Sequence, residues 1–200
     1  ALIASYFINA QKVYIYMRDE YPTVIKILLD EINKMEDEEI IPKDFFIVRR
    51  GAGAYICGEE SAMIESIEGK RGLPRHRPPY VAEIGLFGCP TLTNNLETLF
   101  WVRDIIEKGA KWFAEKGSNG NKGFHSFSVS GRVKNPGVKV APAGITIQQL
   151  IDKYCDGMAD GHTFKGYLPG GASGGILPAT MNDIPLDYGS KELMDAGCFL

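Results

Sequence analysis

The sequence predicts an α/β fold in the first half of the chain and a small α+β module in the second half. A strand, a helix and a second strand follow one another between residues 12 and 48, and a glycine-rich bend comes directly after them. Beyond residue 120 the order is hairpin, helix and strand. Two hundred residues are enough for one large domain or two modest ones, each with its own core.

The first elements are read from hydrophobic periodicity. Residues 1–9 are typical of the end of a helix, and residues 12–18 interleave three apolar side chains with two tyrosines, which favours a strand. Pro22 is suited to the first turn of a helix, whose apolar stripe consists of Val24, Ile25, Leu28, Leu29 and Ile32. Residues 45–48 are all apolar, as in a buried parallel strand. Together they predict a βαβ unit.

The next elements follow from turn residues. Residues 51–58 form a glycine-rich bend, and a short helix is expected from about Glu59 to Ile67, with Gly69 as its stop. The proline-rich residues 69–90 predict an extended loop. Asn95 is placed to cap a helix that runs to about Lys108, with one apolar face made by Leu99, Val102 and Ile106.

The second half changes character near residue 120. Residues 117–123 are small and polar and predict a linker. A turn at residues 135–137 joins two strands, and Thr146 with Gln149 predicts a capping box ahead of a helix that ends near Gly157. Residues 164–168 predict a further strand. We therefore expect two domains, residues 1–120 and residues 121–200.

Charge and cysteine content limit the possible functions. The formal net charge of −3 gives no general attraction to nucleic acid or anionic lipid. No apolar run approaches the roughly 18 residues of a spanning helix, so we expect a soluble chain. The four cysteines are far apart, which fits buried thiols in a reducing compartment and predicts no metal or iron–sulfur cluster from this segment alone; they are Cys57, Cys89, Cys155 and Cys198.

The glycine-rich bend is the most informative segment. It lies between a predicted buried strand and a helix start, where open α/β sheets place their ligands. A phosphate-binding P-loop does not fit, because Glu59 and Glu60 stand where lysine and serine or threonine are needed. The dinucleotide fingerprint fails as well, since Ile56 occupies its third glycine position. A nucleotide triphosphatase is therefore disfavoured.

The two glutamates allow two interpretations. They could complement the dipole of the helix that starts there. Alternatively, one carboxylate could accept hydrogen bonds from ribose hydroxyls, which would also repel a 2′-phosphate and favour NADH over NADPH. The basic loop, with five cationic or histidine side chains between residues 70 and 77, also allows two interpretations, a solvated loop or a contact with a ligand. Residues 93–98 could be a helix cap or a donor-rich site for a phosphate or ribityl chain.

A long run of residues carries a resemblance to a known family. The segment from Gly51 reads GAGAYICGEESAMIESIEGKRGLPRHRPPY and is followed by GLFGCPTLTNNLETL. This resembles the NADH-binding flavoprotein subunits, which comprise the 51-kDa or F subunit of complex I and the diaphorase subunits of NAD-linked formate dehydrogenases and hydrogenases. The match covers about residues 49–99, with weaker similarity in YIYMRDEYP and YLPGGASGGILPA.

The resemblance implies a flavin and a nicotinamide nucleotide. FMN would lie across the glycine-rich bend, NADH would stack on it, and hydride transfer would need alignment of the two rings and no general base. The residues implied for FMN are Tyr55, Gly58, Glu59, Glu60, Thr93, Asn94, Asn95 and Thr98. Those implied for NADH are Tyr55, Glu60, Arg77 and Tyr80. Many relatives have lysine and phenylalanine where this chain has Arg77 and Tyr80.

The resemblance also implies a larger assembly. The fold would be a partial, Rossmann-like FMN-binding α/β sandwich followed by a β-grasp domain of the ubiquitin-like SLBB type. Further parts are expected outside this segment, namely a second glycine-rich loop upstream and the cysteines of a [4Fe–4S] cluster downstream. Alone, the segment is expected to bind flavin poorly. Expected partners are a thioredoxin-like [2Fe–2S] subunit and the iron–sulfur or catalytic subunits of a cytoplasmic complex. The alternative is a non-catalytic β-grasp module that binds a ligand or a subunit.

Overall fold

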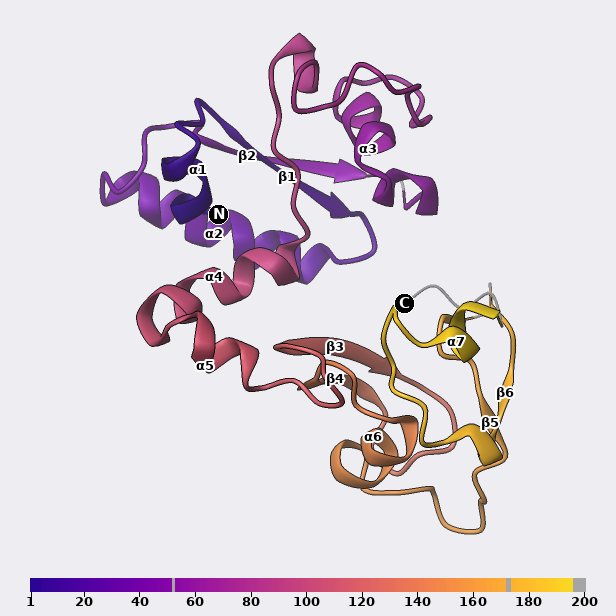
Figure 1. Cartoon of the computed structure of the whole chain (residues 1–200). Helices are drawn as coiled ribbons and strands as arrows, with labels where there is room; N and C mark the ends of the chain where they lie inside the picture. Colours follow the sequence, from indigo (N-terminus) through magenta and orange to yellow (C-terminus); the bar gives the residue numbers. More distant parts are fainter. Residues whose placement is uncertain (52, 172–173, 196–200) are drawn as a thin grey trace. The chain divides into compact units, whose positions relative to one another are not determined.

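The computed structural model describes residues 1–51, 53–171 and 174–195 (Figure 1). The chain divides into two compact units, Ala1–Phe100 and Trp101–Leu200. The first unit contains, in chain order, α1 (Leu2–Phe7), β1 (Val13–Arg18), α2 (Pro22–Asp37), β2 (Phe46–Gly51), the 3-10 turn η1 (Tyr55–Gly58), α3 (Glu60–Ile67), the 3-10 turn η2 (Leu86–Gly88) and the start of α4 (Leu96–Lys108).

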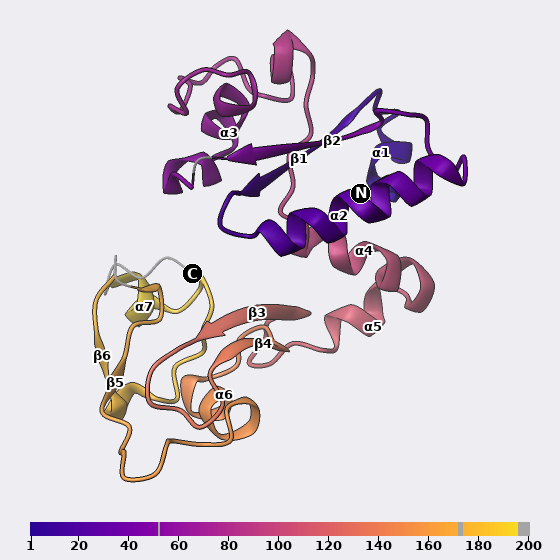
Figure 2. The same cartoon turned by 180° about the vertical axis from the view of Figure 1, so that it is seen from behind.

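The first unit is built on the predicted βαβ unit. β1 and β2 pair in parallel, with Val13 opposite Phe46 and Arg18 opposite Gly51, and α2 runs along one face of the pair (Figures 1 and 2). The core is formed by Ile32, Ile41 and Phe46, and α1 contributes Leu2 to it. The mixed α/β character that the sequence predicts is confirmed for this unit.

The apolar stripe of α2 is narrower than the sequence predicts. Ile25 and Ile32 are buried and Leu28 packs against the core, but Val24 and Leu29 are exposed. A two-stranded sheet covers only a thin strip of a helix surface, so the side chains at the margins of the stripe find no apolar neighbour on it. The prediction that both belong to the buried stripe is therefore wrong within this unit.

The second unit contains the rest of α4, which crosses the border, and a series of short elements. These are α5 (Ala110–Ala114), β3 (Phe124–Val129), β4 (Gly137–Pro142), α6 (Ile147–Tyr154), β5 (Gly166–Tyr167), β6 (Leu177–Pro178), the 3-10 turn η4 (Ala179–Met181) and α7 (Lys191–Asp195). The predicted hairpin is present as the antiparallel pair β3 and β4. The strand expected at residues 164–168 is shorter, because only two of its residues pair with β6.

The capping box of α6 is confirmed. The Thr146 hydroxyl accepts a hydrogen bond from the Gln149 backbone N–H at 3.2 Å, and the Gln149 side chain accepts one from the Thr146 backbone N–H at 3.3 Å. α6 thereby turns its apolar face inward, and Leu150 packs in a core with Ala141, Ile145, Tyr167, Leu177, Leu186 and Leu193. Ile151 joins a second cluster with Val133 and Cys155.

The border between the units lies at residue 100, whereas the sequence places a domain boundary near residue 120. The reason is aromatic packing: Trp101 stacks on Phe124 with a centroid distance of 4.9 Å and also contacts Phe113. The segment at residues 117–123 is tied down as well, since the Ser118 N–H donates to Ala143 and the Asn121 amide to Asp187. It is thus not a free linker, and the domains 1–120 and 121–200 stay a prediction.

The cysteines differ in their surroundings. Cys57 and Cys155 are buried, as expected of small apolar side chains, and burial raises the pKa of the Cys155 thiol. Cys89 is exposed, so the expectation of burial is wrong for this thiol, which lies just after the η2 turn. Cys198 lies outside the described residues, as do Ala52 in the glycine-rich bend and Ala172 and Ser173 in the PGGASGGILPA segment.

Candidate functional site

The glycine-rich bend leaves the carboxyl end of β2 and leads into α3. Gly53 has a φ of +75°, in the left-handed region that favours glycine, and a Cβ there would displace the flexible carboxylate of Glu20, which lies 2.5 Å away. A Cβ built on Gly58 would meet nothing within 4 Å. The backbone of the bend is therefore open at Gly58, where a flat group can approach it.

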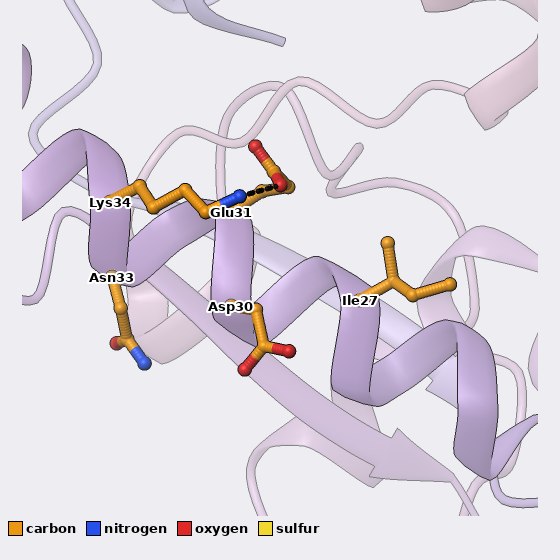
Figure 3. Close-up of a pocket in the computed structure, with 5 residues that line it drawn as sticks. All are labelled: Ile27, Asp30, Glu31, Asn33 and Lys34. Carbon is orange, nitrogen blue, oxygen red and sulfur yellow. Dashed lines mark hydrogen bonds and ion pairs between the residues drawn. The ribbon is translucent and has the colours of Figure 1, made fainter.

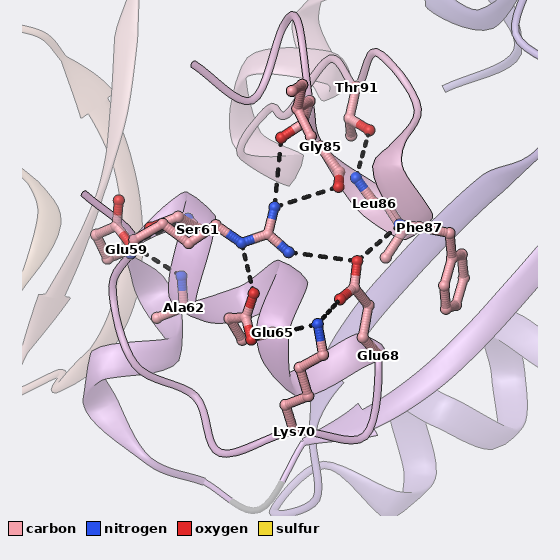
Figure 4. A network of polar contacts seen from close by, with 12 residues as sticks. Glu59, Ser61, Ala62, Glu65, Glu68, Lys70, Gly85, Leu86, Phe87 and Thr91 are labelled. Atoms are coloured by element: carbon pink, nitrogen blue, oxygen red, sulfur yellow. Dashed lines mark hydrogen bonds and ion pairs between the residues drawn. The ribbon is translucent and has the colours of Figure 1, made fainter. Parts of the chain in front are cut away.

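Glu59 caps α3. Its Oε2 accepts hydrogen bonds from the Ser61 N–H at 3.0 Å, the Ala62 N–H at 2.9 Å and the Ser61 hydroxyl at 2.6 Å (Figure 4). These backbone donors are among the free N–H groups that every helix start leaves unpaired. Partial burial raises the pKa of the Glu59 carboxyl, but these hydrogen bonds and the charge of Arg77 outweigh it and hold the pKa below its ordinary value.

Arg77 joins both glutamates. Its Nη2 atom donates to Glu59 Oε1 at 2.7 Å and also lies 2.7 Å from Glu60 Oε1, which makes two ion pairs on one nitrogen. The Thr93 hydroxyl donates to the other carboxylate oxygen of Glu60, Oε2, at 3.0 Å. Residues from the bend, the basic loop and the segment before α4 therefore meet at one point. Four of the predicted site residues are brought together in this way.

The two carboxylates differ in the acceptor capacity that remains. A carboxylate offers about four lone-pair positions. Within the part of the chain that the structure describes, Glu59 accepts four hydrogen bonds, three of them on Oε2 and one, from Arg77, on Oε1. Glu60 accepts one hydrogen bond, from Thr93, and an ion pair from Arg77. The capping interpretation thus describes Glu59, whereas Glu60 has one partner on each carboxylate oxygen and does not cap the helix.

The other predicted site residues lie on the same segments with their side chains in solvent. Tyr55 in η1 is 96% exposed and Tyr80 in the basic loop is 56% exposed. Asn94, Asn95 and Thr98 are exposed at the start of α4, and the Asn95 carbonyl accepts the first hydrogen bond of that helix, from Leu99. Their contacts with FMN or NADH stay predictions.

Arg75 fixes the basic loop to α3, a role that was not evident from the sequence. Its guanidinium pairs with Glu65 and Glu68, at and just after the end of α3, and donates to the carbonyl oxygens of Ile84 and Gly85. Its backbone N–H donates to the buried Ser61 hydroxyl at 2.8 Å. Glutamates three residues apart share one helix face, which was the available sequence signal.

Glu68 is the second anchor of this network. Its Oε1 accepts a hydrogen bond from the Phe87 N–H at 2.7 Å, and its Oε2 accepts one from Lys70 at 2.7 Å (Figure 4). Partial burial raises the pKa of the Glu68 carboxyl, but the hydrogen bonds from Lys70 and Phe87 and the charges of Lys70 and Arg75 bring it below its ordinary value. The network anchors the chain on both sides of Arg77, at residue 75 and at residues 84–87.

Two hollows lie elsewhere on the first unit. One, of about 600 Å³, lies over the Arg75 network between α3 and η2 and is lined by Glu65, Lys70, His76, Pro79 and Phe87, among others. The other, of about 410 Å³, is a shallow surface of α2 beside the Lys34–Glu31 ion pair (Figure 3). The predicted site residues, all of which are described, line neither hollow.

Metal-binding clusters and membrane spans are both absent from residues 1–51, 53–171 and 174–195. In these ranges no three His, Cys, Asp or Glu side chains gather as they would around a metal ion. None of the helices in these ranges combines the length and the apolar character that crossing a bilayer requires.

Comparisons with known proteins place the chain in a flavoprotein family. Residues 1–104 match the family described as the Nuo51 FMN-binding domain. The chain is 42% identical over 195 residues to the F subunit of the NADH-quinone oxidoreductase of Mycobacterium bovis, covering 94% of this chain and 44% of that protein. The corresponding F subunit of Rickettsia typhi is 39% identical over 205 residues, covering 98% of this chain and 49% of that protein.

A solved structure is similar throughout the chain. It is the crystal structure of an NAD⁺-reducing [NiFe]-hydrogenase in the air-oxidised state, with a TM-score of 0.81 and 36% identity, covering 94% of this chain and 32% of the hydrogenase chain. The same enzyme type in the H₂-reduced state gives a TM-score of 0.80. The chain spans slightly less than half the length of the curated relatives it matches.

Proposed function

Because the chain belongs to the family of NADH-binding 51-kDa or F flavoprotein subunits, we propose that it forms part of an NADH:FMN oxidoreductase subunit in a multi-subunit complex. The similar proteins are named as subunits of NADH-quinone oxidoreductases and as an NAD⁺-reducing hydrogenase. The substrate of this chain would accordingly be NADH or NAD⁺.

The observation that carries the proposal is the meeting of Glu59, Glu60, Arg77 and Thr93 at the carboxyl end of β2. Ligands of open α/β sheets bind at this end of the strands. The Glu60 carboxylate keeps acceptor positions that suit the two neighbouring hydroxyls of a ribose. Its negative charge would repel a 2′-phosphate, which favours NADH over NADPH. Arg77 and Tyr80 would contact the adenosine half through charge and ring stacking.

The residues present also fit FMN. The open side of the bend at Gly58 lets a flat ring approach the backbone, and the exposed Tyr55 ring lies in the same bend. Asn94, Asn95 and Thr98 place amide and hydroxyl groups at the start of α4, where a phosphate could be held together with the backbone near Thr93. Glu59 and Glu60 could accept hydrogen bonds from the hydroxyls of the ribityl chain. When bound, FMN would accept the hydride of NADH and pass electrons onward one at a time. The chain would bind and orient both groups.

The wider assignment follows from the same family. We propose that the first unit is part of a Rossmann-like FMN-binding sandwich, and that the second is a β-grasp domain of the SLBB type, with its β3–β4 hairpin and α6. A [4Fe–4S] cluster would be supplied by another segment of the subunit. Its partners would be a thioredoxin-like [2Fe–2S] subunit and the iron–sulfur or catalytic subunits of a complex I, a formate dehydrogenase or a hydrogenase in the cytoplasm.

The test is flavin content and activity of the complete subunit. We expect heat-released FMN and NADH-dependent reduction of ferricyanide. Asn95→Ala should bind FMN about tenfold more weakly, which is the expected effect of one lost hydrogen bond to a charged group. Fluorescence of bound and released flavin measures this affinity, and thermal unfolding of the flavin-free protein separates it from stability.

Asn33→Ala is the matched control, since Asn33 is an exposed asparagine of α2 (Figure 3). It should leave the flavin affinity unchanged. A complete subunit without flavin and without ferricyanide reduction would refute the proposal. Full flavin affinity in Asn95→Ala would remove Asn95 from the site.

The second candidate is a ligand- or subunit-binding module of the β-grasp type, without catalysis. It is favoured by the exposed side chains of Val138 and Val140 on β4, which leave apolar surface on the hairpin of the second unit. The flavin and ferricyanide measurements decide between the two, because a pure interaction module gives neither signal.

A further inference from the structure

We propose that Thr93 is a positioning residue whose hydroxyl holds the Glu60 carboxylate ready for a nicotinamide nucleotide. This inference rests on the proposed function and deepens it. The family resemblance implied that Thr93 contacts FMN, but its hydroxyl is directed to Glu60 Oε2 at 3.0 Å. The assignment separates Thr93 from the neighbouring Asn94 and Asn95, whose side chains are exposed.

The geometry fixes both oxygens of one carboxylate. Oε1 of Glu60 lies 2.7 Å from Arg77 and Oε2 accepts the Thr93 hydrogen bond. The Glu60 side chain is 35% exposed and has three rotatable bonds, so without these anchors it would sample several rotamers. Arg77 also serves Glu59 and cannot hold Glu60 in one orientation alone. The Thr93 hydroxyl is the second contact, and together with Arg77 it fixes the orientation of the carboxylate plane.

A fixed carboxylate binds more tightly than a mobile one. Ordering a flexible side chain opposes association, and a group held in its bound position before the ligand arrives avoids that cost. Each oxygen of Glu60 still has acceptor capacity after its anchor is satisfied. The two remaining positions can receive the hydroxyls of one ribose. Thr93 would thereby raise the affinity for the nucleotide without touching it.

The bond also connects two distant segments. Glu60 is the first residue of α3, whereas Thr93 lies 33 positions later, just before α4. The segment implied in FMN binding and the residue implied in nucleotide binding are thus coupled by one hydroxyl. A threonine that served only the flavin would leave the Glu60 carboxylate held by Arg77 alone.

The experiment compares Thr93→Val, which keeps the shape and removes the hydroxyl, with Thr93→Ser, which keeps the hydroxyl. Both are made in the complete, flavin-loaded subunit, and Thr23→Val on the exposed face of α2 is the matched control. NAD⁺ binding is measured by titration calorimetry, and flavin content is measured on the same samples. We expect Thr93→Val to weaken NAD⁺ binding about threefold to tenfold, the range of a lost hydrogen bond to a charged group that remains partly hydrated.

The flavin content of Thr93→Val should stay at the wild-type value, and Thr93→Ser should restore NAD⁺ affinity to within about twofold, since it keeps the donor to the charged group. Unchanged NAD⁺ affinity in Thr93→Val overturns the inference, and so does a loss of flavin with NAD⁺ affinity preserved, because Thr93 would then be a flavin ligand. A wild-type subunit that binds neither flavin nor NAD⁺ refutes the proposed function itself. The two failures are therefore distinguishable.

Discussion

At the scale of the residue, Glu59 and Glu60 are adjacent in sequence but differ in what their side chains do. Glu59 uses its acceptor positions on the start of α3 and on Arg77. Glu60, one position later, forms an ion pair with Arg77 and accepts a hydrogen bond from Thr93. The difference arises because Glu59 has extended backbone at the cap position, with φ −73° and ψ 134°, whereas Glu60 is already helical. Position relative to a helix start thus separates a carboxylate that caps the helix from one that contacts other segments.

Substitution of Glu59 by glutamine should lower the free energy of unfolding by about 1 kcal/mol near pH 7, the usual value of a helix cap. Glutamine resembles the protonated acid, so the effect reports the charge. The pKa of Glu59 is lowered in the folded state. Its stabilisation is therefore present above the unfolded pKa of about 4.3 and is lost as pH falls through the folded pKa. Urea unfolding at several pH values measures this.

The deficit of Glu59→Gln relative to the wild type should accordingly shrink below about pH 4. Glu59→Asp, which keeps a carboxylate and is a favoured capping residue, is the control and should retain most of the stability. A deficit that stays constant from about pH 7 to about pH 3 would mean that the charge of Glu59 contributes nothing to the cap.

The sequence indicated the candidate residues better than it indicated their contacts. Glu60, Arg77 and Thr93 were all named, yet their meeting depends on how the loop at residues 69–90 folds back on α3. Proline content predicts only that such a loop is not helical. The Arg75 network that folds it back was missed as well, since the spacing of Glu65 and Glu68 marks a helix face but does not indicate which loop residue pairs with it. The sequence therefore predicted which residues could bind a ligand, but it did not predict how the loop brings them together.

At the scale of the element, α6 offers a clean test of a local signal. Thr146→Ala removes the hydroxyl that accepts the Gln149 N–H and should lower the stability of the second unit by about 1 kcal/mol. Thr146→Ser should retain the cap. Thr163→Ala is the control, because Thr163 is exposed in the same unit. Equal urea midpoints for Thr146→Ala and Thr163→Ala would show that the capping box adds no stability.

Elements with strong local signals were the ones predicted well. The capping box, the turn before β4 and the parallel strands each depend on a few neighbouring residues, and each is present. The extent of burial was predicted less well, as Val24 and Leu29 of α2 show. Burial depends on which elements lie against a helix, which its own periodicity cannot specify. The strand at residues 164–168 was shortened likewise, because only its middle finds pairing positions on β6.

At the scale of the whole molecule, each unit has a core of its own. Ile32, Ile41 and Phe46 are central to the first unit, and the clusters around Leu150 and Ile151 belong to the second. Both tryptophans of the chain, Trp101 and Trp112, lie in the second unit. Tryptophan fluorescence therefore reports on the second unit, whereas far-ultraviolet circular dichroism reports on both. The candidate site lies in the first unit, which has no tryptophan.

We expect the two signals to unfold at different urea concentrations, because separate cores give separate cooperative transitions. Glu59→Gln should move the circular dichroism transition and leave the tryptophan transition in place, since Glu59 caps a helix of the first unit. Thr146→Ala should move the tryptophan transition. If both probes gave one coincident transition in the wild type and both variants shifted it equally, the chain would unfold as one body. Stability and ligand binding would then be coupled across residue 100, through α4, the helix that crosses the border.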